Sequence, residues 1–431
     1  MRSHCALDTV LSFHHRGLSD AVEAATKVVA GDLREEWVDR PIRHLPFAPC
    51  RILPRNVIMQ ERSRLVPAAT AGDAPAVELY DKPRVTQDSS DGGDHAVNAG
   101  VLSADRYVRL PTIQHHARGL AICDTAGGAE ARGASYVVDA ESAYRFCQVQ
   151  EADLWTQCFI WWDHDGSAGV CVDRRLGFGG AFAPNRFERV STLVAAHIQA
   201  LQLAFDATQT PPHSVALWAA ERRAAQARGE LPESADQLSP SHRQVYIDDF
   251  TGSALDHPVS TPSSVAGIDI GPQQILSEGG VPAVPGSCVY VHAQLAVRGL
   301  RDFGLNAAPG KVVVGDPVVA LGFRVSRAAR RLDCPPLKRA AILSDIARQR
   351  AAAIDHLRVD RQQAERLVGR CCNLSQVFPE LKPAMHGGYA VSQASWPGRQ
   401  RGKRRRPPLL QLLQPPGGAR RSARRRRGGR A

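Results

Sequence analysis

The stretch Tyr246-Ile247-Asp248-Asp249-Phe250 places two adjacent carboxylates between β-branched and aromatic residues. The residues before the acids favour a β-strand, and the Asp-Asp pair favours a turn. We therefore expect a β-hairpin whose tip holds both acids clear of the sheet. Carboxylates in this position suit Mg²⁺, which takes oxygen ligands and keeps waters for a substrate phosphate. An ordinary solvated turn has the same composition, so the stretch alone does not establish a metal site.

A second β-rich run, Ser135–Asp139, ends in a carboxylate far upstream of the paired acids. Two-metal phosphoryl transfer needs carboxylates from separate strand ends, holding two ions roughly 3.5–4 Å apart. Asp139, Asp248 and Asp249 would supply such a set. Between the two runs lies the stretch Leu176-Gly-Phe-Gly-Gly-Ala-Phe-Ala-Pro-Asn-Arg-Phe187, which predicts a glycine-rich turn that leads into a helix. These three elements together predict a phosphoryl-transfer site.

The order of these elements resembles the catalytic core of reverse transcriptases. That family has an acid followed five residues later by an aromatic, here Asp139 and Tyr144, then a Phe-Gly…Ala-Pro…Phe turn and Tyr-x-Asp-Asp. Two further blocks match, Gly304-Leu305-Asn306 with Lys311, and Leu321-Gly322-Phe323. The resemblance covers roughly residues 75–390 and is greatest to the retrotransposon-type branch.

The resemblance implies an α+β right-hand polymerase, with fingers, a palm made of an antiparallel sheet packed on helices, and a helical thumb-like region. The expected regions are an N-terminal extension over 1–75, fingers over 76–134, palm over 135–330, thumb-like or connection region over 331–395, and a disordered basic tail over 396–431. The chain departs from the family between Phe187 and Tyr246, where many fewer residues are usual. We therefore expect palm insertions at about 209–242 and 254–285, because surface loops tolerate added length at little cost.

By the same resemblance, the expected activity is RNA-directed DNA synthesis, in which dNTPs are added to a primer 3′-hydroxyl by two-metal nucleotidyl transfer. Asp139, Asp248 and Asp249 would be the catalytic acids. Together with the backbone carbonyl of Ala140 they would bind two Mg²⁺ ions, with Mn²⁺ as a possible substitute. The partners would be an RNA or DNA template, a DNA primer, dNTPs and possible other retroelement proteins.

The resemblance also assigns residues to the incoming nucleotide. Arg84, with Lys82 as a second, would grip the triphosphate, for which the bidentate fork of a guanidinium is well suited. Tyr144 would stack beneath the sugar and exclude a 2′-hydroxyl. Phe178 and Gly179 would lie against the nucleotide and template. The alternatives are an exposed strand arginine for Arg84 and a core tyrosine for Tyr144.

Two further assignments concern the phosphates and the primer. Lys311 would meet the phosphates or the leaving group, although a surface lysine has the same sequence signature. Leu321, Gly322 and Phe323 resemble the hairpin that grips the primer 3′ end. After it we expect helices over 337–357 and 361–377. Their arginines would follow a duplex backbone or form a solvated face.

Several shorter patterns predict local structure. We expect an amphipathic helix over 18–29 capped by Ser19, and a surface His14-His15 pair. A hairpin is expected over 155–172, and a helix over 186–207 whose buried face includes Leu193.

The net charge of +11 lies entirely in the C-terminal tail. Residues 397–431 carry twelve Arg, one Lys and no acid, whereas the remainder carries 41 basic and 43 acidic side chains. Net charge therefore does not demonstrate a basic groove in the body of the chain. Ten cysteines without a CxxC pair, no apolar run long enough for a membrane span and no signal-peptide pattern predict an intracellular protein, cytoplasmic or nuclear, with no membrane partner.

Two alternatives to an active reverse transcriptase are compatible with these patterns. A catalytically inactive or domesticated copy would bind nucleic acid without polymerising it, although all three acids, Tyr144 and Lys311 are intact. A viral RNA-dependent RNA polymerase is the other, but the bulky Tyr144 and the Tyr-Ile-Asp-Asp sequence weigh against it.

Overall fold

The computed structural model describes residues 14, 18, 21–66, 76–91, 94, 96–233, 238–260, 265, 267–268, 280–308, 310–355, 361–383 and 385. The chain divides into two units with a border near residue 330. The second unit holds residues 331 onward together with residues 112–114 and 322–324, and the first holds the rest. None of the helices within the described ranges combines the length and the apolar character needed to cross a membrane.

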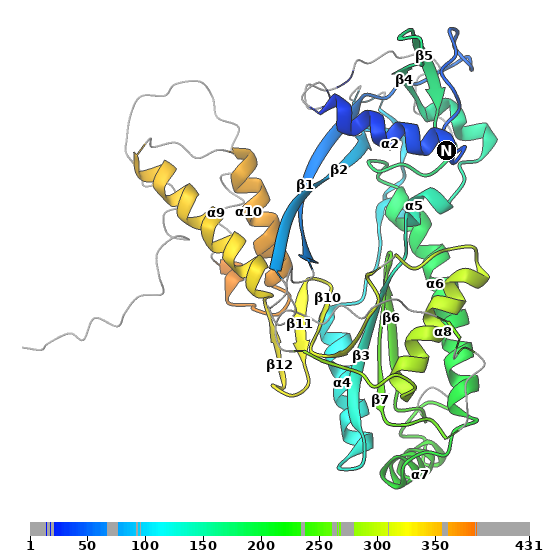
Figure 1. Ribbon diagram of the computed structural model, residues 1–431, viewed down its shortest axis with the longest axis vertical. Coiled ribbons are helices and arrows are strands. Elements are labelled where there is room, and N and C mark those ends of the chain that lie inside the picture. The colour runs from blue at the N-terminus through cyan, green and yellow to red at the C-terminus, as the bar shows by residue number, and fades with distance from the viewer. Residues whose placement is uncertain are drawn as a thin grey trace, which may run out of the picture. The chain divides into compact units, whose positions relative to one another are not determined.

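A five-stranded antiparallel sheet lies at the centre of the first unit (Figure 1). Its order is β6 (His242–Tyr246), β7 (Asp249–Asp256), β3 (Arg132–Asp139), β9 (Val313–Asp316) and β8 (Val281–Pro282). The expected strand ending at Asp139 and the expected hairpin at the paired acids are both confirmed. The hairpin tip does not hold both acids clear of the sheet, however, because Asp249 begins β7 and only Asp248 lies in the turn. Because β7 pairs with β6 on one side and β3 on the other, the two acidic elements are neighbours.

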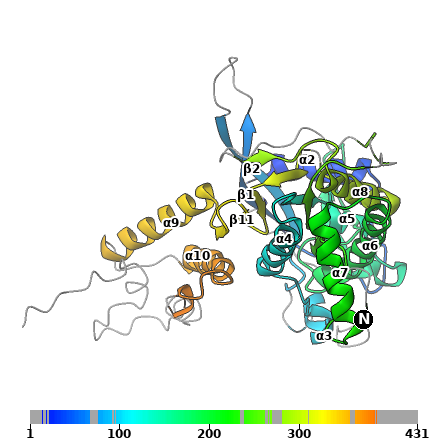
Figure 2. The same cartoon turned by 90° about the horizontal axis from the view of Figure 1, so that it is seen from below.

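Helices cover both faces of this sheet, as Figures 1 and 2 show. They are α6 (Ala183–Asp206) and α8 (Cys288–Asp302) on one face, and α4 (Ile113–Gly127) on the other. Strand side chains alternate between the faces. Val138 and Phe250 join the main hydrophobic core with residues of α6 and α8. Ser135 points the other way, and its Oγ lies 3.0 Å from Nε2 of His116 on α4.

Tyr136 explains why a glycine stands in the middle of β7. Gly252 is its direct partner in the β3–β7 register. A Cβ added at Gly252 would lie 2.4 Å from the Tyr136 hydroxyl oxygen, so the ring occupies the space of the missing side chain. The hydroxyl accepts a hydrogen bond of 2.9 Å from Gln202 on α6, which ties the sheet to that helix.

The rest of the first unit contains two hairpins and several helices. The hairpins are β1 (Arg55–Val66) with β2 (Ala76–Gln87), and β4 (Cys158–Trp162) with β5 (Ala168–Val172). The helices are α2 (Val22–Arg34), η2 (Val97–Gly100), α3 (Ser103–Arg106), α5 (Ala143–Phe146), η3 (Glu151–Thr156) and α7 (His213–Ala227). The β1–β2 hairpin contains residues on both sides of the boundary expected at residue 75.

The second unit contains the two helices expected to follow residues 321–323 in the chain. They are α9 (Pro336–Asp355) and α10 (Arg361–Leu374). Three short strands come before these helices in the chain. They are β10 (Val318–Ala320), β11 (Phe323–Ser326) and β12 (Arg331–Asp333). The expected tail over 396–431 lies outside the described residues, as do His15 and Ser19.

Three local expectations need correction. The N-terminal helix begins at Val22, with Ala21 as its N-cap. His14 is half-buried and bonds the Ile160 carbonyl, so it is not a surface residue. Leu193 is 59% exposed, although helical spacing placed it on the buried face of α6.

The expected insertions also have different limits. The loop placed at 254–285 begins later, because β7 continues through Asp256, and residues 261–264, 266 and 269–279 lie outside the described ones. The segment placed at 209–242 ends before His242, which begins β6, and it contains α7.

Candidate active site

The strand register brings two of the predicted acids face to face. Asp139 is the last residue of β3 and pairs directly with Asp249, the first residue of β7. Directly paired residues point to the same face, with Cβ atoms about 4.5–5.5 Å apart. The preceding pair, Val138 and Phe250, points into the core under α6 and α8. The two carboxylates therefore lie on the opposite face, at the end of the sheet.

Asp248 is held beside them by the hairpin turn. Ile247 has a φ of 58°, an unfavourable conformation for a β-branched residue. The Asp248 carbonyl accepts a hydrogen bond of 2.9 Å from the Ala140 amide, which fastens the turn to the chain just after Asp139. Backbone strain of this kind persists only where surrounding contacts impose it, and it is concentrated at functional sites. The third acid is thus placed by backbone contacts.

Lys311 forms an ion pair with Asp139. The chain before Lys311 is bonded to the acidic strand end: the Ala308 amide donates to the Asp139 carbonyl at 2.7 Å. The Asp139 side chain is 15% exposed and that of Lys311 is 51% exposed. Clustered carboxylates repel one another, and the lysine offsets part of this repulsion. The predicted lysine is therefore in the site and contacts an acid directly.

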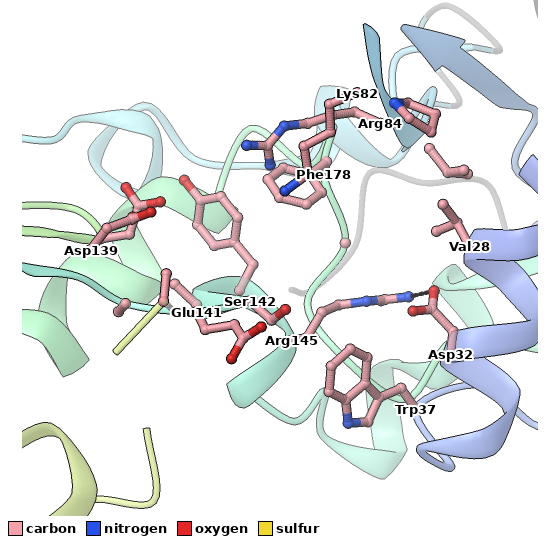
Figure 3. A pocket seen from close by; sticks show the side chains of 18 of the residues that line it. Val28, Asp32, Trp37, Lys82, Arg84, Asp139, Glu141, Ser142, Arg145 and Phe178 are labelled. Atoms are coloured by element: carbon pink, nitrogen blue, oxygen red, sulfur yellow. Dashed lines mark hydrogen bonds and ion pairs between the residues drawn. The ribbon is translucent and has the colours of Figure 1, made fainter. Parts of the chain in front are cut away.

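A cavity of about 590 Å³ collects most of the predicted residues, and we call it the acid pocket. Nine of the predicted residues line it: Lys82, Arg84, Asp139, Ala140, Tyr144, Phe178, Asp248, Asp249 and Lys311. Figure 3 shows Lys82, Arg84 and Phe178 on one side of it and Asp139 on another. The pocket thus places cationic groups and carboxylates around one space, which suits a ligand carrying phosphates and metal ions.

Arg84 stands on β2 and faces the pocket. Its guanidinium carbon lies 5.1 Å from the centroid of the Phe178 ring, within the range of a cation–π interaction. Its Nε donates to Oε1 of Gln60 at 3.1 Å on the paired strand. The side chain is half-buried, whereas Lys82 is exposed. Arg84 is therefore an oriented cation of the pocket wall, rather than a loose surface charge.

Tyr144 lies on the short helix α5, which follows the acidic strand. Its ring packs edge-on against Phe178 at 5.1 Å and Phe187 at 5.6 Å between centroids. Burial, with a contribution from Asp248, raises the pKa of Tyr144 to about 12, so the hydroxyl stays protonated at neutral pH. The ring is half-buried and also packs against the core, so it acts at once as a core residue and as part of the pocket wall.

Gly179 does not line the acid pocket, although its neighbour Phe178 does. Its φ is 120°, and an added Cβ would lie 1.8 Å from the Gln87 carbonyl oxygen. The Gln87 amide in turn donates to the Phe178 carbonyl at 2.7 Å. The glycine therefore allows the turn to close against the end of β2, and this closure positions Phe178.

Leu321, Gly322 and Phe323 form a tight turn, with φ values of 50° at Leu321 and 76° at Gly322. Within the second unit, Nζ of Lys338 donates to the Gly322 carbonyl at 3.0 Å and to Oδ1 of Asn373 at 2.6 Å. Phe323 is fully buried, and the same ammonium lies 5.1 Å from its ring centroid. These three residues do not line the acid pocket.

The sequence reading missed a buried ion cluster that consists of Asp32, Arg55, Arg145 and Asp173. Asp173 has no exposed side-chain surface, and it accepts from Nη1 of Arg145 at 2.7 and 2.8 Å and from Nη2 of Arg55 at 2.9 Å. Arg145 also pairs with Asp32, as Figure 3 shows. Burial raises the pKa of Asp32, and the attraction of Arg145 offsets this in part.

Three members of the cluster, Asp32, Arg55 and Arg145, also line the acid pocket. Arg145 directly follows Tyr144 in α5, so its ion pairs fix the helix that carries the tyrosine. The four members come from α2, β1, α5 and the residue after β5, separate elements of the first unit. The signal available in the sequence was weak: Asp173 is a charge placed directly after an apolar strand, and nothing in its spacing indicates its partners.

No protein-family model matches the sequence, and no curated protein matches it. Among solved structures, the chain is similar to one of a foamy viral protease-reverse transcriptase in complex with double-stranded DNA. The two share 13% sequence identity, with a TM-score of 0.44. The similarity covers 95% of this chain and 51% of the other, so the chain spans about half the length of that protein.

Proposed function

We propose that the chain is an RNA-directed DNA polymerase of a retroelement, which adds dNTPs to a primer 3′-hydroxyl. The central sheet with α6 and α8 would be its palm, the β1–β2 hairpin part of its fingers, and α9 with α10 its thumb-like region. One observation carries this proposal. Asp139 and Asp249 are direct cross-strand partners, with Asp248 in the adjoining turn, and all three line a pocket that also contains Arg84 and Lys311.

The donor set fits two divalent ions of the Mg²⁺ class. Two carboxylates from neighbouring strands and a third from the adjoining turn supply the oxygen ligands that Mg²⁺ prefers, and Mn²⁺ accepts the same ligands. Asp139, Asp248 and Asp249 would hold the ions, with the carbonyl of Ala140 as an additional ligand. When bound, such ions activate an attacking hydroxyl and stabilise the charge on the phosphate and the leaving group.

The other residues of the pocket would bind and orient the nucleotide. Arg84, already aligned over Phe178, would bind the triphosphate through its planar fork, and Lys82 would add a second cation. Lys311 would exchange its contact with Asp139 for a phosphate oxygen. Phe178 and Tyr144 form an aromatic wall against which the nucleotide would rest.

Primer extension tests this proposal. A folded preparation of the full chain should extend a DNA primer on an RNA template in the presence of Mg²⁺ and dNTPs, and should lose this activity when the metal is chelated. Extension with NTPs in preference to dNTPs would instead indicate an RNA polymerase. No extension by a folded chain that still binds the hybrid would contradict the proposal and indicate a nucleic-acid-binding protein without catalysis.

Tyr144 gives a prediction about sugar selection. Because its ring forms the pocket wall, Tyr144→Ala should open space for a 2′-hydroxyl and lower the preference for dNTPs over NTPs by roughly 100-fold, as steric discrimination in a pocket allows. Tyr144→Phe keeps the ring and should keep the preference. The measurement is the ratio of kcat/KM for dNTP and NTP. An unchanged ratio in Tyr144→Ala would leave the tyrosine with its core role alone.

A further inference from the structure

A second cluster of metal-ligating side chains lies away from the acid pocket, at the C-terminal end of α6. Asp206, Cys288 and His292 offer one oxygen, one sulfur and one nitrogen atom, which all lie within 4.8 Å of one another. Cys288 and His292 are four residues apart on α8, so helical periodicity places them on one face. Asp206 is the last residue of α6, the helix that packs against α8.

The cluster is buried. His292 is 1% exposed and Cys288 is 7% exposed, and the Asp206 side chain is 21% exposed. Oδ1 of Asp206 lies 2.7 Å from Nε2 of His292 and 3.9 Å from Sγ of Cys288. Nδ1 of His292 is buried and has no hydrogen-bond partner among the described residues. The Cys288 thiol and the His292 imidazole therefore both approach the same carboxylate oxygen of Asp206, an arrangement that side-chain packing alone does not require.

A small cavity adjoins these three residues. It measures about 60 Å³, and His257 lines it together with Asp206, Cys288 and His292. This volume exceeds what one water molecule needs. Tetrahedral zinc, with bonds of about 2.0–2.3 Å, separates its ligand atoms by roughly 3.3–3.8 Å. The Asp206–His292 separation is shorter than that range and the Asp206–Cys288 separation is slightly longer, so each of these two pairs needs an adjustment under 1 Å. All three ligand atoms lie within 4.8 Å of one another.

The geometry points to a structural site for a thiophilic divalent ion of the Zn²⁺ class, bound by Asp206, Cys288 and His292, with His257 or water as the fourth ligand. Mixed S, N and O donors favour zinc over Mg²⁺, which takes oxygen ligands. The neighbouring groups suit this ion. Oδ2 of Asp206 accepts a hydrogen bond of 2.8 Å from Ser239, which orients the carboxylate.

The position of the site indicates what it would do. Asp206 is the last residue before the segment 207–241, which contains α7 and returns to the sheet at β6. Ser239, near the end of that segment, is bonded to the proposed ligand Asp206. An ion at this point would fasten both ends of the segment to α8. The role of this ion would be to stabilise the fold. The proposed metal site does not depend on the proposed polymerase activity.

Cobalt substitution tests the site. Co²⁺ bound to a thiolate has a strong charge-transfer absorption, whereas Co²⁺ bound by carboxylates alone lacks it. The purified full chain should retain about one Zn²⁺ after gel filtration, and Co²⁺ should produce thiolate charge-transfer absorption. Cys288→Ser should remove that absorption. Cys123→Ser is the matched control, since Cys123 is also fully buried in the first unit but lies outside the cluster, and it should retain the absorption.

Two further measurements complete the test. His292→Gln keeps the thiolate and loses one ligand, so its Zn²⁺ affinity should fall at least about tenfold, and it replaces Cys288→Ser where that variant does not fold. Removing Zn²⁺ from the wild type should lower its Tm, and adding Zn²⁺ back should restore it. A folded wild-type chain that retains no Zn²⁺ and shows no thiolate–cobalt absorption would overturn the proposal. Absorption that persists in Cys288→Ser, or affinity unchanged in His292→Gln, would also overturn it.

Discussion

Asp248→Asn should reduce Mg²⁺-dependent primer extension by at least about a thousandfold, which corresponds to about 4 kcal/mol of transition-state stabilisation. The substitution keeps the size of the side chain and removes its charge. Asp248 lies in a turn that backbone contacts fasten to Ala140, so the amide should occupy the same place. The loss would therefore reflect the missing metal ligand, and the measurement is kcat/KM for dNTP addition.

Glu141→Gln is the matched control, because Glu141 is another carboxylate of the acid pocket but is not part of the cross-strand acid set. It should retain activity within a few-fold of wild type. An equal loss in both variants would indicate that general negative charge matters in place of metal ligation. The Asp248→Asn chain should also unfold at the same urea concentration as wild type or a higher one, because it has less repulsion among its acids.

Local patterns in the sequence were sufficient to predict the strands that carry the candidate site. The β-rich runs before Asp139 and around the paired acids each favoured a strand, and the structure confirms β3 and the β6–β7 hairpin. What no local pattern contains is the register. That Asp139 stands opposite Asp249 follows from the pairing of two strands far apart in the sequence.

Other features depended on contacts that a single sequence does not specify. Gly179 is required by the approach of the Gln87 carbonyl, a long-range packing contact that a nucleotide-binding reading of the turn did not foresee. Leu193 shows the limit of helical periodicity. Its spacing places it on the buried face of α6, but the described elements leave most of its side chain exposed. The Asp206–Cys288–His292 cluster joins two helices whose packing no spacing in the sequence indicates.

The buried ion cluster supplies the second large effect. Asp173→Ala should lower the free energy of unfolding by about 3–5 kcal/mol, because it leaves two buried guanidinium groups without their shared carboxylate. The Arg55 and Arg145 side chains are 3% and 9% exposed, so water does not replace the lost charge. The measurement is urea unfolding, in which the midpoint should fall while the slope stays constant.

Two companion variants serve as controls. One separates the loss of the Asp173 charge from the loss of its side-chain volume, and the other removes an exposed acid instead of a buried one. Asp173→Asn keeps the shape but lacks the charge, so its loss should be smaller than that of Asp173→Ala yet still exceed about 1 kcal/mol. Glu23→Ala removes an acid that is 89% exposed and paired with Lys27, and should change stability by no more than about 0.5 kcal/mol.

A loss below about 1 kcal/mol in Asp173→Ala would contradict the assignment of Asp173 as the charge partner of both arginines. The stability change should also reach the acid pocket, since Arg145 holds the helix that carries Tyr144. Asp173→Asn, assayed where it remains folded, should therefore discriminate dNTPs from NTPs less well than wild type. Glu23→Ala should discriminate as well as wild type does, because Glu23 contacts no part of the cluster or the pocket among the described residues.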